Sequence, residues 1–172
     1  MTQNVRGDIS LTKACREVGG KMILIGLGSN IEGPWGSPQM CLKKALEMLD
    51  SGPVRLVAAS SIILTAPFGK TDQPDFANAV ARVESGLGAA ELMAFLHGIE
   101  AQAGRVRAER WGPRTLDLDL LDLDGRIQAA DPILPHPGIA ERAFVLGPIA
   151  EIAPEWRHPV TGERVKEMLG RL

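Results

Sequence analysis

The feature that most constrains the fold is an alternation of strand-like segments with two amphipathic helices. Residues 22–30 (MILIGLGSN) form an apolar run that ends in Gly-Ser-Asn, as a buried strand does where it enters a loop. Residues 37–49 and 89–104 carry apolar side chains at helical spacing, and Gly104 closes the second helix as a C-terminal cap would. Further strand-like segments cover residues 54–64, 76–85 and 115–125. This order predicts an α+β fold, a ferredoxin-like α/β sandwich with helices packed on an antiparallel sheet.

The segments between these elements carry turn and loop signals. Residues 65–74 (TAPFGKTDQP) form a ten-residue loop, a length that in compact domains is often functional. An Asp-Gly turn at 124–125 suggests that residues 126–128 return as the hairpin partner of the preceding strand. Residues 131–172 are rich in proline, which predicts short helices and loops packed over one end of the sheet.

Length and charge limit the classes of function. A chain of 172 residues fits one domain, which we expect at 21–172. Residues 1–20 form an N-terminal extension, for which a disordered tail, an extra helix and translated sequence upstream of the true start all stay open. A formal net charge of −2 gives no positive field for non-specific binding of nucleic acid or of an anionic membrane. No apolar run reaches the roughly 18 residues of a membrane span. Cys15 and Cys41 are too few for a disulfide framework, so the cytoplasm is the expected compartment.

Two carboxylates stand out in the stretch RWGPRTLDLDL at 110–120. Residues i and i+2 of a strand share a face about 7 Å apart, so Asp117 and Asp119 place two like charges side by side. Oxygen ligands without His or Cys favour Mg²⁺, which takes one or two carboxylates and completes its shell with water and phosphate. Taken alone, the same pattern also fits a strand with a solvent-facing edge, and we assign Asp122 and Asp124 to such an edge.

The arginines that precede the aspartates favour the metal site. Arg105, Arg107, Arg110 and Arg114 lie within ten positions that contain no lysine. A guanidinium binds pairs of phosphate oxygens through its planar fork and keeps its charge. Carboxylates for a metal beside arginines for phosphate indicate a site for a metal-bound nucleotide.

In its motifs, the chain resembles the 6-hydroxymethyl-7,8-dihydropterin pyrophosphokinase family. Six segments match that family in order over about residues 22–172. They are GSN (28–30), TDQPDFANAV (71–80), GRVR (104–107), RWGPRTLDLDLL (110–121), LPHPGIAERAFVLGP (134–148) and IAPEW (152–156). The resemblance implies an enzyme of folate biosynthesis that transfers the β,γ-pyrophosphoryl group of ATP to the pterin hydroxymethyl group and releases AMP, with two Mg²⁺ ions.

The resemblance also implies roles for individual residues. On the nucleotide side, Asp117 and Asp119 hold both metals, Arg105 and Arg114 bind phosphate, and Arg107 and Trp111 belong to a loop that closes over ATP and seals the site. His136, Arg142 and Glu100 match further nucleotide contacts. On the pterin side, Phe76 and Phe144 sandwich the ring, and Asn78 reads its edge together with the backbone of Thr65, Pro67 and Phe68. The resemblance assigns Trp111 to both the ATP site and the pterin site. A monomer is expected.

This chain departs from the family pattern in a few places, and two other functions stay open. The arginine loop is one residue shorter, Pro137 follows His136 where an aromatic is common, and Phe76 lacks a tyrosine hydroxyl. One rival is a nucleotidyltransferase, which would release pyrophosphate instead of AMP. The other is a non-catalytic ferredoxin-like module that binds RNA or a small effector. RNA-binding sheets of this class display aromatic side chains for base stacking together with basic residues. This chain has no tyrosine, only four phenylalanines and no such pattern, so it matches that class poorly.

Overall fold

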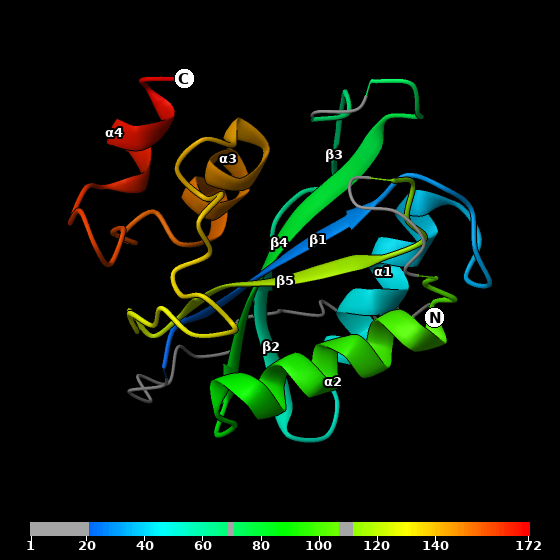
Figure 1. The fold of residues 1–172 in the computed structure, drawn as a ribbon, viewed down its shortest axis with the longest axis horizontal. Coiled ribbons are helices and arrows are strands. Elements are labelled where there is room, and N and C mark those ends of the chain that lie inside the picture. The colour runs from blue at the N-terminus through cyan, green and yellow to red at the C-terminus, as the bar shows by residue number, and fades with distance from the viewer. Residues whose placement is uncertain (1–20, 69–70, 107–111) are drawn as a thin grey trace, which may run out of the picture.

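A computed structural model describes residues 21–68, 71–106 and 112–172 of the chain (Figure 1). The predicted residues Arg107, Arg110 and Trp111 and the extension at 1–20 lie outside the described residues. In chain order the elements are β1 (Ile23–Ser29), α1 (Pro38–Leu49), β2 (Val54–Ala59), β3 (Ile63–Thr65), β4 (Phe76–Ser85), α2 (Ala89–Gln102), β5 (Asp117–Leu123), α3 (Ala143–Ile152) and α4 (Val165–Leu169).

The strands form one antiparallel sheet in the order β2-β4-β1-β5, and β3 also pairs with β4. The strand β1, which is apolar except for its last residue Ser29, therefore lies in the interior of the sheet between β4 and β5, as its composition favours. This order of strands and helices confirms the predicted ferredoxin-like α+β fold.

Helices cover both faces of the sheet and create two apolar cores (Figure 1). The larger core joins α1 and α2 to one face through residues such as Leu42, Leu96 and Ile25. The smaller core joins α3 and α4 to the other face. It is built around Leu24, Val80 and Leu121 of the sheet and the buried aromatic residue Trp156. Because α3 and α4 cover only part of the second face, the rest of that face is open for a binding site (Figure 1).

Local signals explain where the two long helices begin and end. Ser37 caps α1 by accepting a hydrogen bond from the Met40 amide at 3.4 Å, and Pro38 occupies the first turn. At the start of α2, the Glu91 side chain accepts a hydrogen bond from the Gly88 amide at 2.9 Å. Gly104 follows α2 with a φ of +74°, a conformation that glycine adopts without strain. The predicted ends of both helices are confirmed.

The strand predicted at 54–64 is wrong, because the structure divides it into β2 and β3. The break lies at the buried residue Ser60, whose amide donates to the Val80 carbonyl and whose hydroxyl accepts from the Val80 amide, both at 2.9 Å. The adjacent Ser61 donates its amide and hydroxyl to Glu151 on α3, again at 2.9 Å. Serine side chains here replace strand hydrogen bonds and turn the chain out of line.

The hairpin predicted after β5 is also wrong. Asp124 and Gly125 form a turn with positive φ values of 53° and 71°, but the chain then leaves β5 and Gln128 bridges Leu134 instead. Residues that follow this bridge return to the edge of β5, where the His136 amide donates to the Leu121 carbonyl at 2.8 Å. The turn was therefore predicted correctly and its partner was not.

A β-bulge in β5 overturns the placement of Asp122 on a solvent-facing edge. Ile25 pairs with Leu120 while Leu24 pairs with Asp122, so Leu121 is an extra residue in the strand. Asp122 consequently turns to the face covered by α3 and α4, where it is 2% exposed and accepts a hydrogen bond from the Trp156 indole at 2.9 Å. Burial raises the pKa of Asp122, and the Trp156 hydrogen bond opposes that rise. Asp124 is exposed, as predicted.

Among the described residues, no helix is long and apolar enough to cross a membrane.

Candidate functional site

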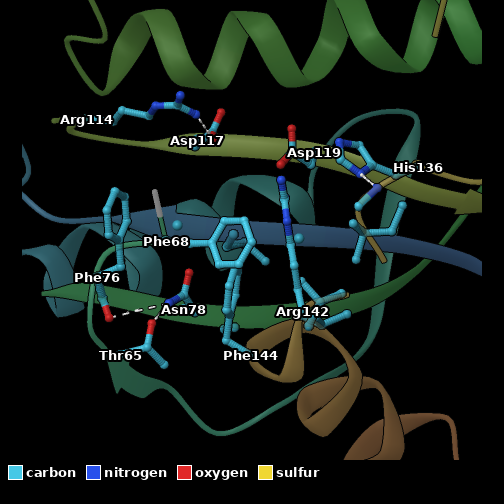
Figure 2. Close-up of a pocket in the computed structure, with 18 of the residues that line it drawn as sticks. Thr65, Phe68, Phe76, Asn78, Arg114, Asp117, Asp119, His136, Arg142 and Phe144 are labelled. Atoms are coloured by element: carbon cyan, nitrogen blue, oxygen red, sulfur yellow. Dashed lines mark hydrogen bonds and ion pairs between the residues drawn. The ribbon is translucent and has the colours of Figure 1, made fainter. Parts of the chain in front are cut away.

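The open part of the second sheet face holds a pocket, and most of the residues predicted from the sequence meet there (Figure 2). β5 contributes the two aspartates, β4 contributes Phe76 and Asn78, and α3 with the turn before it contributes Phe144 and Arg142. The floor is built by β1, on which Gly28 pairs with Asp117 and Gly26 pairs with Asp119. These glycines carry no side chain, so the space between β4 and β5 stays open.

The two aspartates form the acidic part of the pocket. Asp117 and Asp119 alternate with Leu118 and Leu120, which pack into the core on the opposite face, so both carboxylates point into the pocket. Burial raises the pKa of Asp119 to about 7, and repulsion from Asp117 adds to this effect, while the positive charges of Arg142 and Arg114 oppose it. A divalent cation would relieve this repulsion.

The chemistry of this pair fits Mg²⁺. Both candidate ligands are carboxylate oxygens, and the part of the chain that the structure describes has no cluster of three or more His, Cys, Asp or Glu side chains that could hold a metal. Mg²⁺ usually binds one or two carboxylates and keeps sites for water and substrate phosphate, whereas a site formed by protein groups alone would need more ligands.

Two predicted phosphate-binding arginines contact the first aspartate. Arg105 contacts Asp117 at 2.7 Å, and Arg114 forms a second ion pair with the other oxygen of the same carboxylate. Arg114 lines the pocket, and its side chain is about a quarter exposed (24%), so its guanidinium can reach a ligand. Arg105 is more enclosed at 15% exposure. The two cations therefore lie where phosphate oxygens bound next to the aspartates would be neutralised.

Asn30 fixes the loop that carries Arg114. This residue is 2% exposed and follows β1. Its side-chain oxygen accepts a hydrogen bond from the Arg114 backbone amide at 2.8 Å, and its backbone amide donates to the Arg114 carbonyl at 3.0 Å. Its side-chain nitrogen donates to Gln73 at 3.0 Å and to the Pro74 carbonyl at 3.1 Å. One buried side chain thus joins the loop before β5 to the loop before β4.

Aromatic and amide groups form the other half of the pocket. Phe76 and Asn78 share one face of β4, as their spacing predicts, and Phe144 approaches from α3 (Figure 2). The Asn78 side chain donates to the Thr65 hydroxyl at 2.7 Å and is itself only 8% exposed. This bond and a longer one to the Phe76 carbonyl at 3.5 Å orient the side-chain amide, so its oxygen can accept a hydrogen bond from the polar edge of a flat ring. Thr65 and Phe68 also line the pocket, whereas Ala66 lines it in place of the predicted Pro67.

Arg142 links the aromatic half to the acidic half. Its guanidinium carbon lies 5.7 Å from the centre of the Phe68 ring and 5.9 Å from that of Phe144, within the range of cation–π attraction. Figure 2 shows the guanidinium directed toward Asp119. A β-carbon on Gly138 would lie 2.7 Å from this guanidinium, so a side chain there would displace it.

His136 lies at the same end of the pocket as Arg142. Burial lowers the pKa of His136, and the charge of Arg142 lowers it further, so the neutral imidazole is favoured. Its Nδ1 accepts a hydrogen bond from the Gly138 amide at 3.1 Å, which leaves the proton on Nε2. His136 is therefore suited to donate one hydrogen bond to a ligand, and less suited to supply a positive charge.

Glu100 does not belong to the pocket lining. It lies on α2, is 2% exposed, accepts from the Leu118 amide at 2.8 Å and pairs with Arg105. Its assignment as a nucleotide contact stays a prediction, as do the contacts assigned to Arg107 and Trp111, which lie outside the described residues.

Sequence reasoning missed three features of the site. Gln73 lines the pocket and holds Asn30, yet within its loop only proline, glycine and aspartate carry a recognisable turn signal. The Phe68 ring packs against Phe144 with centres 6.3 Å apart, although only its backbone was assigned a role. The open floor at Gly26 and Gly28 was visible in the sequence as glycines inside an apolar strand, a known sign of close approach.

Comparison with known proteins is consistent with this geometry. A model of the family described as 7,8-dihydro-6-hydroxymethylpterin-pyrophosphokinase (HPPK) matches residues 24–154. A Methylorubrum extorquens protein named 2-amino-4-hydroxy-6-hydroxymethyldihydropteridine pyrophosphokinase is 44% identical over 151 residues, which cover 86% of this chain and 91% of the relative. A Pseudomonas aeruginosa protein of the same name is 39% identical, with 86% and 89% covered.

A solved structure supports the fold. The crystal structure of Plasmodium falciparum HPPK-DHPS wild type matches with a TM-score of 0.67 over 88% of this chain. The match spans 44% of that longer protein at 11% identity, so it bears on the fold alone.

Proposed function

This chain belongs to the 7,8-dihydro-6-hydroxymethylpterin-pyrophosphokinase family, and we propose on that basis that it transfers the pyrophosphoryl group of ATP to the hydroxymethyl group of 6-hydroxymethyl-7,8-dihydropterin. This activity belongs to folate biosynthesis, and its products are AMP and the pterin diphosphate. The predicted family resemblance is confirmed over most of the chain.

One observation carries the proposal: a pair of carboxylates with attendant arginines and an aromatic pocket with a buried amide share one sheet face. Asp117 and Asp119 stand on β5, and Phe76 and Asn78 stand two strands away on β4, with only the glycines of β1 between them. A pterin held over β4 would therefore present its hydroxymethyl group toward phosphates held over β5. Such positioning can supply several kcal/mol of a transfer barrier, on the order of 7–11 in favourable cases.

On the nucleotide side, Asp117 and Asp119 would hold two Mg²⁺ ions. These ions would draw negative charge from the phosphate oxygens while the β-phosphorus is attacked. Arg114 and Arg105 pair with the Asp117 carboxylate and would bind phosphate oxygens held next to it. Arg142, held against two aromatic rings, faces Asp119 and would neutralise negative charge on the phosphate oxygens that the metal ions and the other arginines leave (Figure 2).

On the pterin side, Phe76 and Phe144 would stack on the two faces of the ring. Asn78, oriented by Thr65 and by the Phe76 carbonyl, offers its side-chain oxygen as an acceptor to the polar edge of the ring. Most of the pocket wall is apolar, which would limit the access of water to the hydroxyl of a bound pterin. Closure over ATP by Arg107 and Trp111 stays a prediction from the sequence resemblance, because both residues lie outside the described residues.

Analysis of the products separates this function from its enzymatic rival. Incubation of the protein with ATP, Mg²⁺ and the dihydropterin alcohol should release AMP in a one-to-one ratio with pterin consumed. A nucleotidyltransferase would release pyrophosphate from the same mixture, and a non-catalytic binding module would leave ATP intact. Formation of pyrophosphate without AMP would refute the proposal. A monomeric state and a cytoplasmic location stay predictions.

A further inference from the structure

The buried carboxylate of Glu100 lies behind the acidic half of the pocket and has no direct part in the function proposed above. It projects from α2, the helix that packs against β5 on the face opposite to the pocket. Its Oε1 accepts a hydrogen bond from the Leu118 amide at 2.8 Å and also contacts the guanidinium of Arg105. With 3% of its side chain exposed, Glu100 is enclosed by protein and does not line the pocket.

The first contact fixes the backbone between the two aspartates. Leu118 stands between Asp117 and Asp119 and pairs with Leu27 of β1. Its amide donates to Glu100, so it points away from β1 and toward the free edge of the sheet. An edge amide without a partner would let this part of the strand shift, because only one side of β5 is held by strand pairing. Glu100 supplies the missing acceptor at the point where a shift would move both carboxylates.

The second contact fixes the charge next to Asp117. Arg105 lies between two carboxylates, pairing with Glu100 and, at 2.7 Å, with Asp117. Glu100 therefore shares the positive charge that would otherwise bind Asp117 alone. A guanidinium committed entirely to Asp117 would compete with a cation for that carboxylate.

From these contacts we propose that Glu100 is a positioning residue for the metal-binding aspartates. It holds the backbone between them through Leu118, and it shares Arg105 with Asp117, whose other oxygen pairs with Arg114. This inference rests on the proposed role of Asp117 and Asp119 as metal ligands. It differs from a direct contact between Glu100 and nucleotide, because it places the effect of Glu100 on the affinity for the divalent ion. Groups that hold metal ligands in this way typically change metal affinity by about 10- to 100-fold when replaced.

Two substitutions separate the contacts. Glu100→Gln keeps an oxygen that can accept from Leu118 but removes the charge that holds Arg105. Glu100→Ala removes both. Glu47→Gln on α1 is a matched control, because it neutralises a glutamate whose side chain is 69% exposed and which pairs only with Lys44 among the contacts of the described residues.

The test measures Mn²⁺ binding to the full-length protein with a non-hydrolysable ATP analogue, by the electron paramagnetic resonance of free Mn²⁺. We expect the dissociation constant to rise about 10-fold or more in Glu100→Gln and further in Glu100→Ala, and to be unchanged in Glu47→Gln. The Mg²⁺ concentration for half-maximal activity should rise in the same order, with the KM for ATP at saturating Mg²⁺ little changed. Circular dichroism identifies any variant that fails to fold, and Glu100→Gln then decides the test.

Unchanged Mn²⁺ binding in a folded Glu100→Gln and Glu100→Ala would overturn the inference. So would a raised KM for ATP that saturating Mg²⁺ does not relieve, since that result places the effect of Glu100 on nucleotide binding, directly or through Arg105, and not on the divalent ion. If wild-type protein forms no AMP but Mn²⁺ binding still weakens in the expected order, the proposed function fails and the positioning role stands. Wild-type protein that binds no Mn²⁺ would refute the metal assignment and the inference together.

Discussion

Replacing Asn30 by alanine should weaken both the fold and the activity, because this one side chain joins two loops of the site. Its oxygen accepts from the Arg114 amide at 2.8 Å, and its nitrogen donates to Gln73 at 3.0 Å and to Pro74 at 3.1 Å. Alanine removes all three bonds. The backbone bond from the Asn30 amide to the Arg114 carbonyl at 3.0 Å remains.

The cost follows from the surroundings of each lost partner. The Arg114 amide is left as a part-buried donor without its acceptor, which costs about 1–3 kcal/mol. Gln73 is half-buried and Pro74 is exposed, so water can replace much of what they lose, and together they add about 1 kcal/mol. The sum is about 3 kcal/mol, which corresponds to a fall in Tm of roughly 9 °C for a chain of this size. Displacement of Arg114 by about 1 Å should also reduce kcat/KM by about 100-fold.

The assay combines calorimetric unfolding with steady-state kinetics. Gln128→Ala is a matched control. The side-chain nitrogen of Gln128 also donates to two carbonyls, those of Ala130 at 3.2 Å and Pro132 at 2.9 Å, and it does so in a loop outside the pocket. The control should lose some stability and keep its kcat/KM. An Asn30→Ala variant with a Tm within 2 °C of wild type, or one that loses no more activity than Gln128→Ala, would refute the reasoning.

The remaining predictions concern charge. Asp119→Ala should abolish turnover and leave Tm unchanged or higher, because burial and Asp117 already oppose the ionised form; normal turnover in Mg²⁺ would refute the metal assignment. Arg114→Lys should lower kcat by about 100-fold or more if the planar fork matters, and an unchanged rate would make its role structural. Burial raises the pKa of Asp122, so the folded state holds its proton more tightly and stability should fall as pH rises above about 4. Asp122→Asn, which can still accept from Trp156, should lose that pH dependence in urea unfolding.

Much of the fold was predictable because its patterns are local. Apolar spacing located both long helices, and Ser37 and Gly104 marked a start and an end through capping rules that depend on a few neighbouring residues. The fold class followed from the alternation of elements and the few topologies that it permits. The break at Ser60 was not predictable, since it depends on the Val80 backbone twenty residues away.

The site was predictable where spacing alone decides which way a side chain points. Asp117 with Asp119, and Phe76 with Asn78, share a face because each pair is two residues apart in a strand. The predicted position of Asp122 was wrong because the bulge at Leu121 reverses the alternation of side chains between the two faces of the sheet. Two adjacent leucines do not reveal which of them is the extra residue. The cradle of Arg142 was likewise hidden, because it depends on rings that come from different loops.

The central claim is that one sheet face unites a metal-binding carboxylate pair with a pterin pocket. A crystal structure with Mg²⁺, a non-hydrolysable ATP analogue and 6-hydroxymethyl-7,8-dihydropterin tests it most directly. We expect metal density at the carboxylates of Asp117 and Asp119, and the pterin between Phe76 and Phe144 with its edge on Asn78. Phosphates bound away from both aspartates, or a pterin bound outside this pocket, would contradict the account.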